Sequence, residues 1–80
     1  MIIEQGVASI EYGPKGLYSA EVSFEHTFPE PPIVITSQVF NNQNIVVKSE
    51  DITRDGFTAK TCGGFDTEGS RNFSWIAIHF

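Results

Sequence analysis

The side chains that could carry out catalysis are few and widely spaced along this chain. Cys62 is its only cysteine, and His26 and His79 are its only histidines. A cysteine beside a histidine could act as a nucleophile with its base, but a reactive thiolate needs an electropositive surrounding. Cys62 instead closes an alternating apolar segment, where cysteine commonly serves as a small core residue. The sequence therefore predicts no catalytic thiol.

The two histidines could also bind a metal, and an assembly of three copies could gather one histidine around its axis. Isolated histidines lack the ligand spacing of metal sites, however, which favours a solvated or hydrogen-bonded role. With a single cysteine, neither an intrachain disulfide nor a cysteine-rich metal site can form. We therefore expect no metal and no cofactor.

Carboxylates near predicted turns are the other candidates for chemistry: Asp51, Asp55, Asp66 and Glu68. A pair of carboxylates can hydrolyse a glycosidic bond. Asp51 and Asp55, however, flank a turn at residues 53–56, where Asp commonly hydrogen-bonds the backbone. No glycine-rich segment follows a strand and opens a helix, which argues against a phosphate-binding loop. Because no convergent acid–base set is visible, the sequence predicts a protein without enzymatic activity.

The chain is short and acidic, and both properties restrict its partners. Its 80 residues, 40% of them apolar, suffice for one domain, which we place at residues 1–80. The net charge of −5 argues against nucleic acid and anionic membranes, because these ligands require basic surfaces. Residues 1–5 do not resemble a signal peptide, and no apolar run approaches the ~18 residues that span a bilayer. We expect neither nucleic-acid binding nor membrane insertion.

Strands must position these side chains, because apolar and polar residues alternate with a period of two. Tyr18, Ala20, Val22 and Phe24 alternate with polar residues, which is typical of a strand with one buried face. The six predicted strands cover residues 7–12, 18–25, 33–40, 45–51, 57–62 and 71–80. Turn signals separate them, and no helical stripe is present. The sequence therefore predicts an all-β sandwich or barrel.

Several short motifs occur in an order that resembles the H-type lectin domain, a family that includes snail agglutinins and slime-mould discoidins. The motifs are Val22-Ser23-Phe24, Pro31-Pro32, Gly56-Phe57 and Trp75-Ile76-Ala77-Ile78. Members of this family fold as six-stranded antiparallel β-sandwiches and assemble as parallel homotrimers. They bind galactose or N-acetylgalactosamine in clefts between neighbouring subunits. The resemblance implies the same fold, the same assembly and a glycan ligand.

The resemblance also implies three carbohydrate-binding residues: Lys48, Phe65 and Asp66. The family places an arginine eight positions before the glycine of the Gly-Phe pair, and Lys48 stands there in this chain. Lysine keeps the charge but lacks the planar fork of arginine. Phe65-Asp66 matches the family's aromatic–polar pair, which stacks on the sugar and accepts its hydroxyls. The family's acidic residue in the preceding loop has no counterpart in the short turn at residues 13–16.

The resemblance also bears on two structural questions. Trp75 alternates with Phe73 and Ala77, which favours a core anchor over a platform for sugar stacking. Polar residues on the strands could form a charge-paired interface between subunits or a solvated face. These residues are Glu21, Ser23, Glu25, Lys48, Glu50, Thr58 and Lys60.

Two functions follow for the predicted trimer. The first is carbohydrate binding at a cell surface, such as the receptor-binding tip of a phage tail fibre. The second is a structural module that trimerises or caps a fibre without binding sugar. Without a signal peptide or disulfides, we expect a virion protein or a soluble protein that stays in the cytoplasm or is released from the cell.

Overall fold

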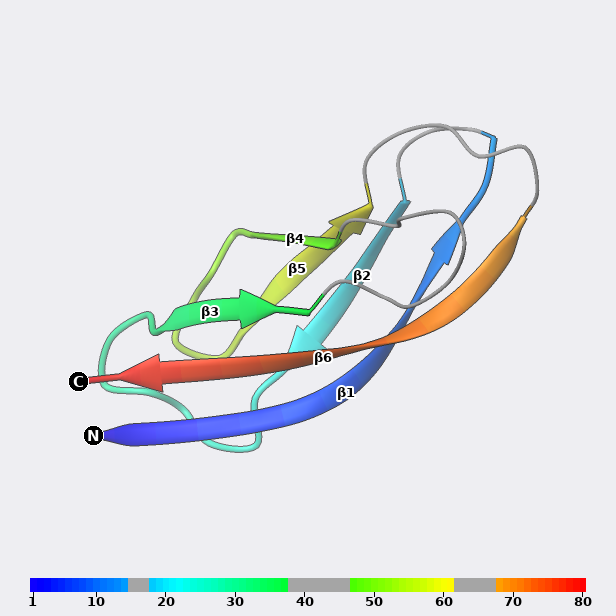
Figure 1. The fold of residues 1–80 in the computed structure, drawn as a ribbon. Coiled ribbons are helices and arrows are strands. Elements are labelled where there is room, and N and C mark those ends of the chain that lie inside the picture. Colours follow the sequence, from blue (N-terminus) through cyan, green and yellow to red (C-terminus); the bar gives the residue numbers. More distant parts are fainter. Residues whose placement is uncertain (15–17, 38–46, 62–67) are drawn as a thin grey trace.

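The protein is an all-β, two-layered structure, as predicted. The computed structural model describes residues 1–14, 18–37, 47–61 and 68–80. Its six strands are β1 (Ile2–Tyr12), β2 (Tyr18–Ser23), β3 (Ile33–Thr36), β4 (Val47–Glu50), β5 (Gly56–Thr61) and β6 (Gly69–His79). They form two three-stranded antiparallel sheets in the orders β1-β6-β3 and β2-β5-β4 (Figure 1). Strand β1 lies over β2 along one edge of the two layers, and β3 lies over β4 along the other edge. We call these edges the β1–β2 flank and the β3–β4 flank.

The predicted alternation holds where it places apolar residues in the core. Val22, Phe24 and Phe57 from one layer pack with Phe73 and Trp75 from the other. The ring centroids of Phe24 and Trp75 are 5.5 Å apart, and those of Phe57 and Trp75 are 5.8 Å apart. Trp75 is only 7% exposed. Its predicted role as a core anchor is confirmed.

Strand β1 begins five residues earlier than predicted. It pairs with β6 along its whole length, from Ile2 opposite His79 to Tyr12 opposite Gly69. The alternation misses its first half because Gly6 occupies an inward position without an apolar side chain. A Cβ at Gly6 would lie 2.8 Å from Cζ2 of Trp75, so glycine leaves the space that the indole occupies. Gly69 and Ser70, predicted as loop, belong to β6 because they pair with Tyr12 and Glu11 at the end of this ladder.

The turn between β4 and β5 is built differently from the prediction. The hydroxyl of Thr53 accepts hydrogen bonds from the backbone N–H groups of Asp55 and Gly56, at 3.1 and 3.2 Å. The carboxylate of Asp55 instead accepts a 2.8 Å hydrogen bond from the hydroxyl of Thr27. The expectation that Asp55 serves its own turn was wrong, because the turn lies against the segment between β2 and β3. Phe28 N–H reinforces this contact by donating to the carbonyl of Arg54 at 2.9 Å.

Candidate functional site

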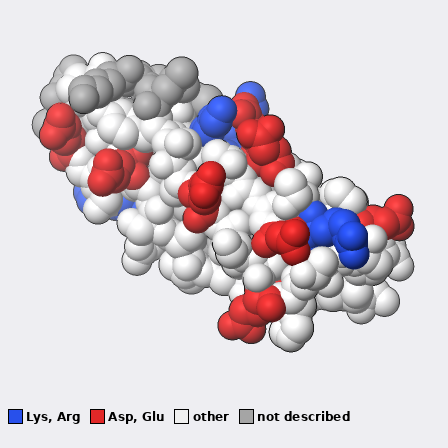
Figure 2. Space-filling view, turned by 180° about the vertical axis from the view of Figure 1, so that it is seen from behind, with Lys and Arg blue, Asp and Glu red and all other residues white. Residues whose placement is uncertain are grey.

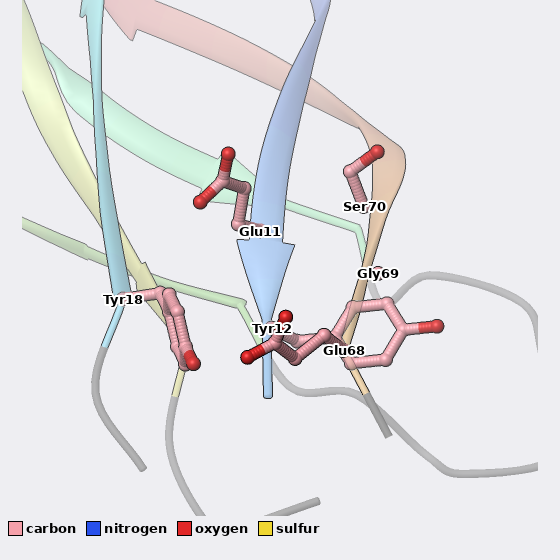
Figure 3. A pocket seen from close by; sticks show the side chains of 6 residues that line it. All are labelled: Glu11, Tyr12, Tyr18, Glu68, Gly69 and Ser70. Carbon is pink, nitrogen blue, oxygen red and sulfur yellow. The ribbon is translucent and has the colours of Figure 1, made fainter. Parts of the chain in front are cut away.

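A cavity of about 490 Å³ opens at the end of the molecule opposite the two termini. It lies where β1 ends and where β2 and β6 begin. Side chains with hydroxyl or carboxylate groups dominate its lining, which consists of Glu11, Tyr12, Tyr18, Glu68, Gly69 and Ser70 (Figure 3). We refer to it as the end pocket.

Strand pairing and one glycine bring these side chains together. Glu11 is paired with Ser70, and Tyr12 with Gly69, in the last two rows of the β1–β6 ladder. A Cβ at Gly13 would lie 2.5 Å from the hydroxyl of Tyr18 and 3.1 Å from Cγ of Glu68. Glycine at this position therefore allows the phenol and the carboxylate-bearing side chain to approach each other across the end of β1. Figure 3 shows Glu68 reaching across this strand end toward Tyr18.

The described lining of the end pocket is acidic. Within residues 1–14, 18–37, 47–61 and 68–80, neither Glu11 nor Glu68 takes part in an ion pair. Arg71 is the nearest basic residue along β6. Its guanidinium group contacts the ring of Tyr12 and not these carboxylates, with its guanidinium carbon 5.6 Å from the ring centroid. Its Nη1 donates a 2.9 Å hydrogen bond to the carbonyl of Ser70. The two carboxylates can accept hydrogen bonds from a ligand, and the half-buried phenol of Tyr18 can donate, accept or stack.

Lys48, the first predicted site residue, lies on β4 and does not line the end pocket. Its Nζ is 3.3 Å from Oε1 of Glu50, while Nζ of Lys60 is 2.8 Å from Oε2 of the same carboxylate. Lys48 and Lys60 are direct cross-strand partners, an unfavourable pairing that Glu50 relieves by binding both. Hydrogen bonds from Lys60 and then Lys48 hold the pKa of Glu50 below its usual value. The hydrogen bond with Glu50 raises the pKa of Lys60.

Phe65 and Asp66, the other two predicted site residues, lie outside the described residues. Sequence reasoning missed Glu11, Tyr12 and Tyr18, and it considered Glu68 only as part of a hydrolytic pair. All four stand at strand ends or beside turns. The apolar–polar alternation stops there, so it gives no sign that these residues share a cavity. Only the β1–β6 register, which a sequence does not fix, brings Glu11 and Glu68 to one place.

The two outer sheet faces differ strongly in polarity. The β2-β5-β4 sheet exposes the polar residues that the sequence offered as an interface or a solvated face, and Lys48 and Lys60 find their acidic partner within the chain. Figure 2 shows acidic and basic groups scattered over a largely uncharged surface seen from behind. The β1-β6-β3 sheet exposes apolar side chains over the half that carries the two termini, and polar ones such as Ser9 and Asn72 over the other half. Its outward positions include Ile3, Val7, Ile33, Ile35, Ile76 and Ile78.

Five of these residues, Ile3, Ile33, Ile35, Ile76 and Ile78, form a cluster across the three strands, which we call the isoleucine face. Ile78 is paired with Ile3 on one side and with Ile33 on the other. Ile76 is paired with Ile35 in the next row. Ile3, Ile33 and Ile35 are 54–55% exposed. A contiguous apolar surface of this kind marks an interaction site more often than a free surface.

Both histidines have carboxylate neighbours. Nδ1 of His26 lies 3.7 Å from Oε1 of Glu4, and Nε2 of His79 lies 3.4 Å from Oε1 of Glu30. The histidines take the two roles expected of them, because His79 lies within hydrogen-bonding distance of its carboxylate and the side chain of His26 is largely solvated. In the described part of the chain, no three His, Cys, Asp or Glu side chains group as metal ligands. The same part contains no helix that is long and apolar enough to cross a membrane.

The fold is similar to domains of phage tailspikes. The tailspike protein gp49 from Pseudomonas phage LKA1 superposes with a TM-score of 0.84 at 17% identity, over 96% of this chain and 15% of that one. The Gp54 tailspike of Acinetobacter baumannii bacteriophage AP22, solved in complex with A. baumannii capsular saccharide, gives a TM-score of 0.74 at 14% identity. That match covers 94% of this chain and 16% of the tailspike. The chain thus spans less than one fifth of either tailspike.

Discoidin II of Dictyostelium discoideum shares the fold as well. Its TM-score is 0.67 at 22% identity, over 98% of this chain and 37% of discoidin II. No protein-family model matches the sequence, and no curated protein matches it either. The similarities therefore establish the fold, which phage tailspikes and a discoidin share.

Proposed function

We propose that this protein is a non-enzymatic, homotrimeric carbohydrate-binding module of the H-type lectin kind, used by a phage tail fibre or tailspike to recognise a cell-surface glycan. The end pocket is the observation that carries the proposal. It combines two carboxylates, which accept hydrogen bonds from sugar hydroxyls, with the half-buried ring of Tyr18, which can stack on a sugar ring. It also lies at the end opposite the termini, where a module joined to a shaft would meet its target.

The isoleucine face supports the proposed trimer. If three copies turn this face toward a common axis, Ile3, Ile33, Ile35, Ile76 and Ile78 leave water together. Each buried CH₂ group contributes roughly 0.8 kcal/mol, so several isoleucines would offset the small core of an 80-residue domain. The polar β2-β5-β4 face would then point outward. Of the two surfaces, the isoleucine face is the better candidate for the subunit interface.

The trimer would also bring Lys48 toward the end pocket. In a closed ring, the β1–β2 flank of one copy faces the β3–β4 flank of the next. Val47 lies in the same cross-strand row as Tyr18, with Thr61 between them, so Lys48 stands near the level of the pocket. We propose that Lys48 of a neighbouring subunit contacts the bound glycan, with Phe65 stacking on the sugar and Asp66 accepting its hydroxyls. Galactose and N-acetylgalactosamine are the sugars to test first.

A glycan array tests this function. The wild-type chain should bind a defined class of glycans, and Glu68→Gln and Phe65→Ala should each weaken that binding while leaving the fold intact. Glu21→Gln is the matched control, because it removes the same charge from an exposed position on β2. Absence of binding by folded wild-type protein, across bacterial and mammalian glycans, would refute the proposal.

The isoleucine face also favours a second function, a module that trimerises or caps a fibre without binding sugar. This face provides an interface that needs no ligand. Ile35→Asp should then convert the trimer into monomers in light scattering, whereas Ser19→Asp on the polar sheet should not. Fused to an unfolded trimeric shaft, the wild-type chain should raise the yield of folded shaft. That result combined with a silent glycan array would favour the structural module, and a monomeric wild-type chain at micromolar concentration would exclude both functions.

A further inference from the structure

We infer that the end pocket selects a glycan with a free ammonium group, such as an amino sugar without its N-acetyl group, and rejects glycans that carry carboxylates or phosphates. This inference rests on the proposed carbohydrate-binding function and specifies the ligand's charge.

The first argument is the charge balance at the pocket. Glu11 and Glu68 both line it, and neither carboxylate has a basic partner among the described residues. The protein does pair carboxylates elsewhere: Glu50 binds two lysines, and Glu4 accepts the backbone N–H groups of Glu25 and His26 at 2.8 and 3.3 Å. The carboxylates of the end pocket are exposed and, like that of Glu21, have no such partner among the described residues; they differ from Glu21 because they line one cavity together.

Arg71 does not neutralise the pair. Its guanidinium lies by the ring of Tyr12 and donates to the carbonyl of Ser70, and it forms no ion pair with Glu11 or Glu68 within the described part of the chain. Even when its charge is counted, the described residues at this end, two carboxylates beside one guanidinium, carry a net negative charge. An anionic sugar entering the pocket would meet like charges, which raises its free energy of binding.

The second argument is the arrangement of the phenols. Tyr18 is half-buried, and its hydroxyl approaches the side chain of Glu68 over Gly13 (Figure 3). A ring next to a carboxylate suits an ammonium group, because the carboxylate accepts its charge-assisted hydrogen bonds and the ring face attracts the cation. Arg71 already uses the ring of Tyr12 in this way.

The cavity size is consistent with a sugar and not with a bare ion. Its volume of about 490 Å³ lies within the range of roughly 300–1,000 Å³ typical of small-molecule sites. A divalent cation would need more ligands than two carboxylates, and the described residues supply no third acidic, cysteine or histidine ligand. A neutral sugar would satisfy the carboxylates through its hydroxyls but would leave their charge unmatched.

The experiment is a chemical-shift titration of the 80-residue chain with three oligosaccharides: chitosan tetramer, its N-acetylated counterpart and an oligogalacturonate. Binding of the chitosan tetramer should be about tenfold tighter than binding of the acetylated oligomer, the ratio expected for charge-assisted hydrogen bonds. Salt should reduce this advantage, since screening weakens exposed charge pairs. Glu11→Gln and Glu68→Gln should each diminish the preference, and Glu21→Gln should retain it.

Each outcome decides between the inference and the function on which it rests. A preference for the ammonium form that the two pocket variants lose, and the control keeps, supports the inference. Equal or tighter binding of the acetylated sugar, or binding of the oligogalacturonate, overturns the inference and leaves the carbohydrate-binding function standing. Failure of a folded wild-type chain to bind any of the three, together with a silent glycan array, overturns both.

Discussion

Gly6→Ala tests the packing that unites the two sheets. An added Cβ would lie 2.8, 2.9 and 3.0 Å from three atoms of the Trp75 indole, closer than carbon atoms can comfortably approach. The indole cannot easily retreat, because it is 7% exposed and packs against Phe24 and Phe57. We therefore expect the free energy of unfolding to fall.

The magnitude follows from two opposing effects. Overpacking a well-filled core costs about 1–3 kcal/mol. Replacing glycine with alanine restricts the unfolded chain and returns about 0.4–1 kcal/mol. The expected net loss is about 1–2 kcal/mol, and each kcal/mol lowers Tm by roughly 4–8 °C in a domain of this size.

Urea denaturation followed by circular dichroism measures this loss, at one fixed protein concentration because an oligomer's stability depends on concentration. Trp75→Phe in the Gly6→Ala background is the second arm, since a smaller ring should accommodate the new methyl group. The double variant should then lose less than the sum of the two single losses. Unchanged or increased stability of Gly6→Ala alone would show that the indole does not occupy the space beside Gly6.

Three further predictions address the core, the charged face and the end pocket. Thr61 is fully buried, and its hydroxyl has no hydrogen-bond partner in the described structure. Thr61→Val should therefore stabilise the protein by about 1 kcal/mol. A fall in the free energy of unfolding, measured by urea denaturation, would show that the hydroxyl does have a partner. The pKa of Glu50 is lowered in the folded state, so its contribution to stability is present above the unfolded pKa and is lost as the pH falls through the folded pKa. Carboxyl NMR should show a titration midpoint for Glu50 below 4.5, and this midpoint should rise in Lys60→Gln. Gly13→Ala would push against the Tyr18 hydroxyl at the edge of the end pocket, so glycan binding should weaken several-fold while Tm changes little, and unaltered binding would place the ligand elsewhere.

The sequence predicts the strands of this fold better than its site, for a physical reason. Alternation records which side chains leave water, and Val22, Phe24, Phe57 and Trp75 all lie in the core as the pattern indicates. It does not record pairing register, which places Glu11 and Glu68 at one cavity. Gly6 shows the same limit within the fold, because its inward position is filled by a side chain from another strand.

The sequence nevertheless carries one signal for the isoleucine face. In β6, residues 75–78 read Trp-Ile-Ala-Ile, so apolar residues occupy both faces of the strand instead of alternating with polar ones. Such a run is typical of a strand covered on both sides. Trp75 and Ala77 are buried by the second sheet, whereas on the open side Ile76 lies between Ile35 and Gln5, and Ile78 lies between Ile33 and Ile3. The pattern of this strand thus indicates cover on both faces, of which the described residues of one chain supply one layer, and in the proposed trimer another copy of the chain supplies the second.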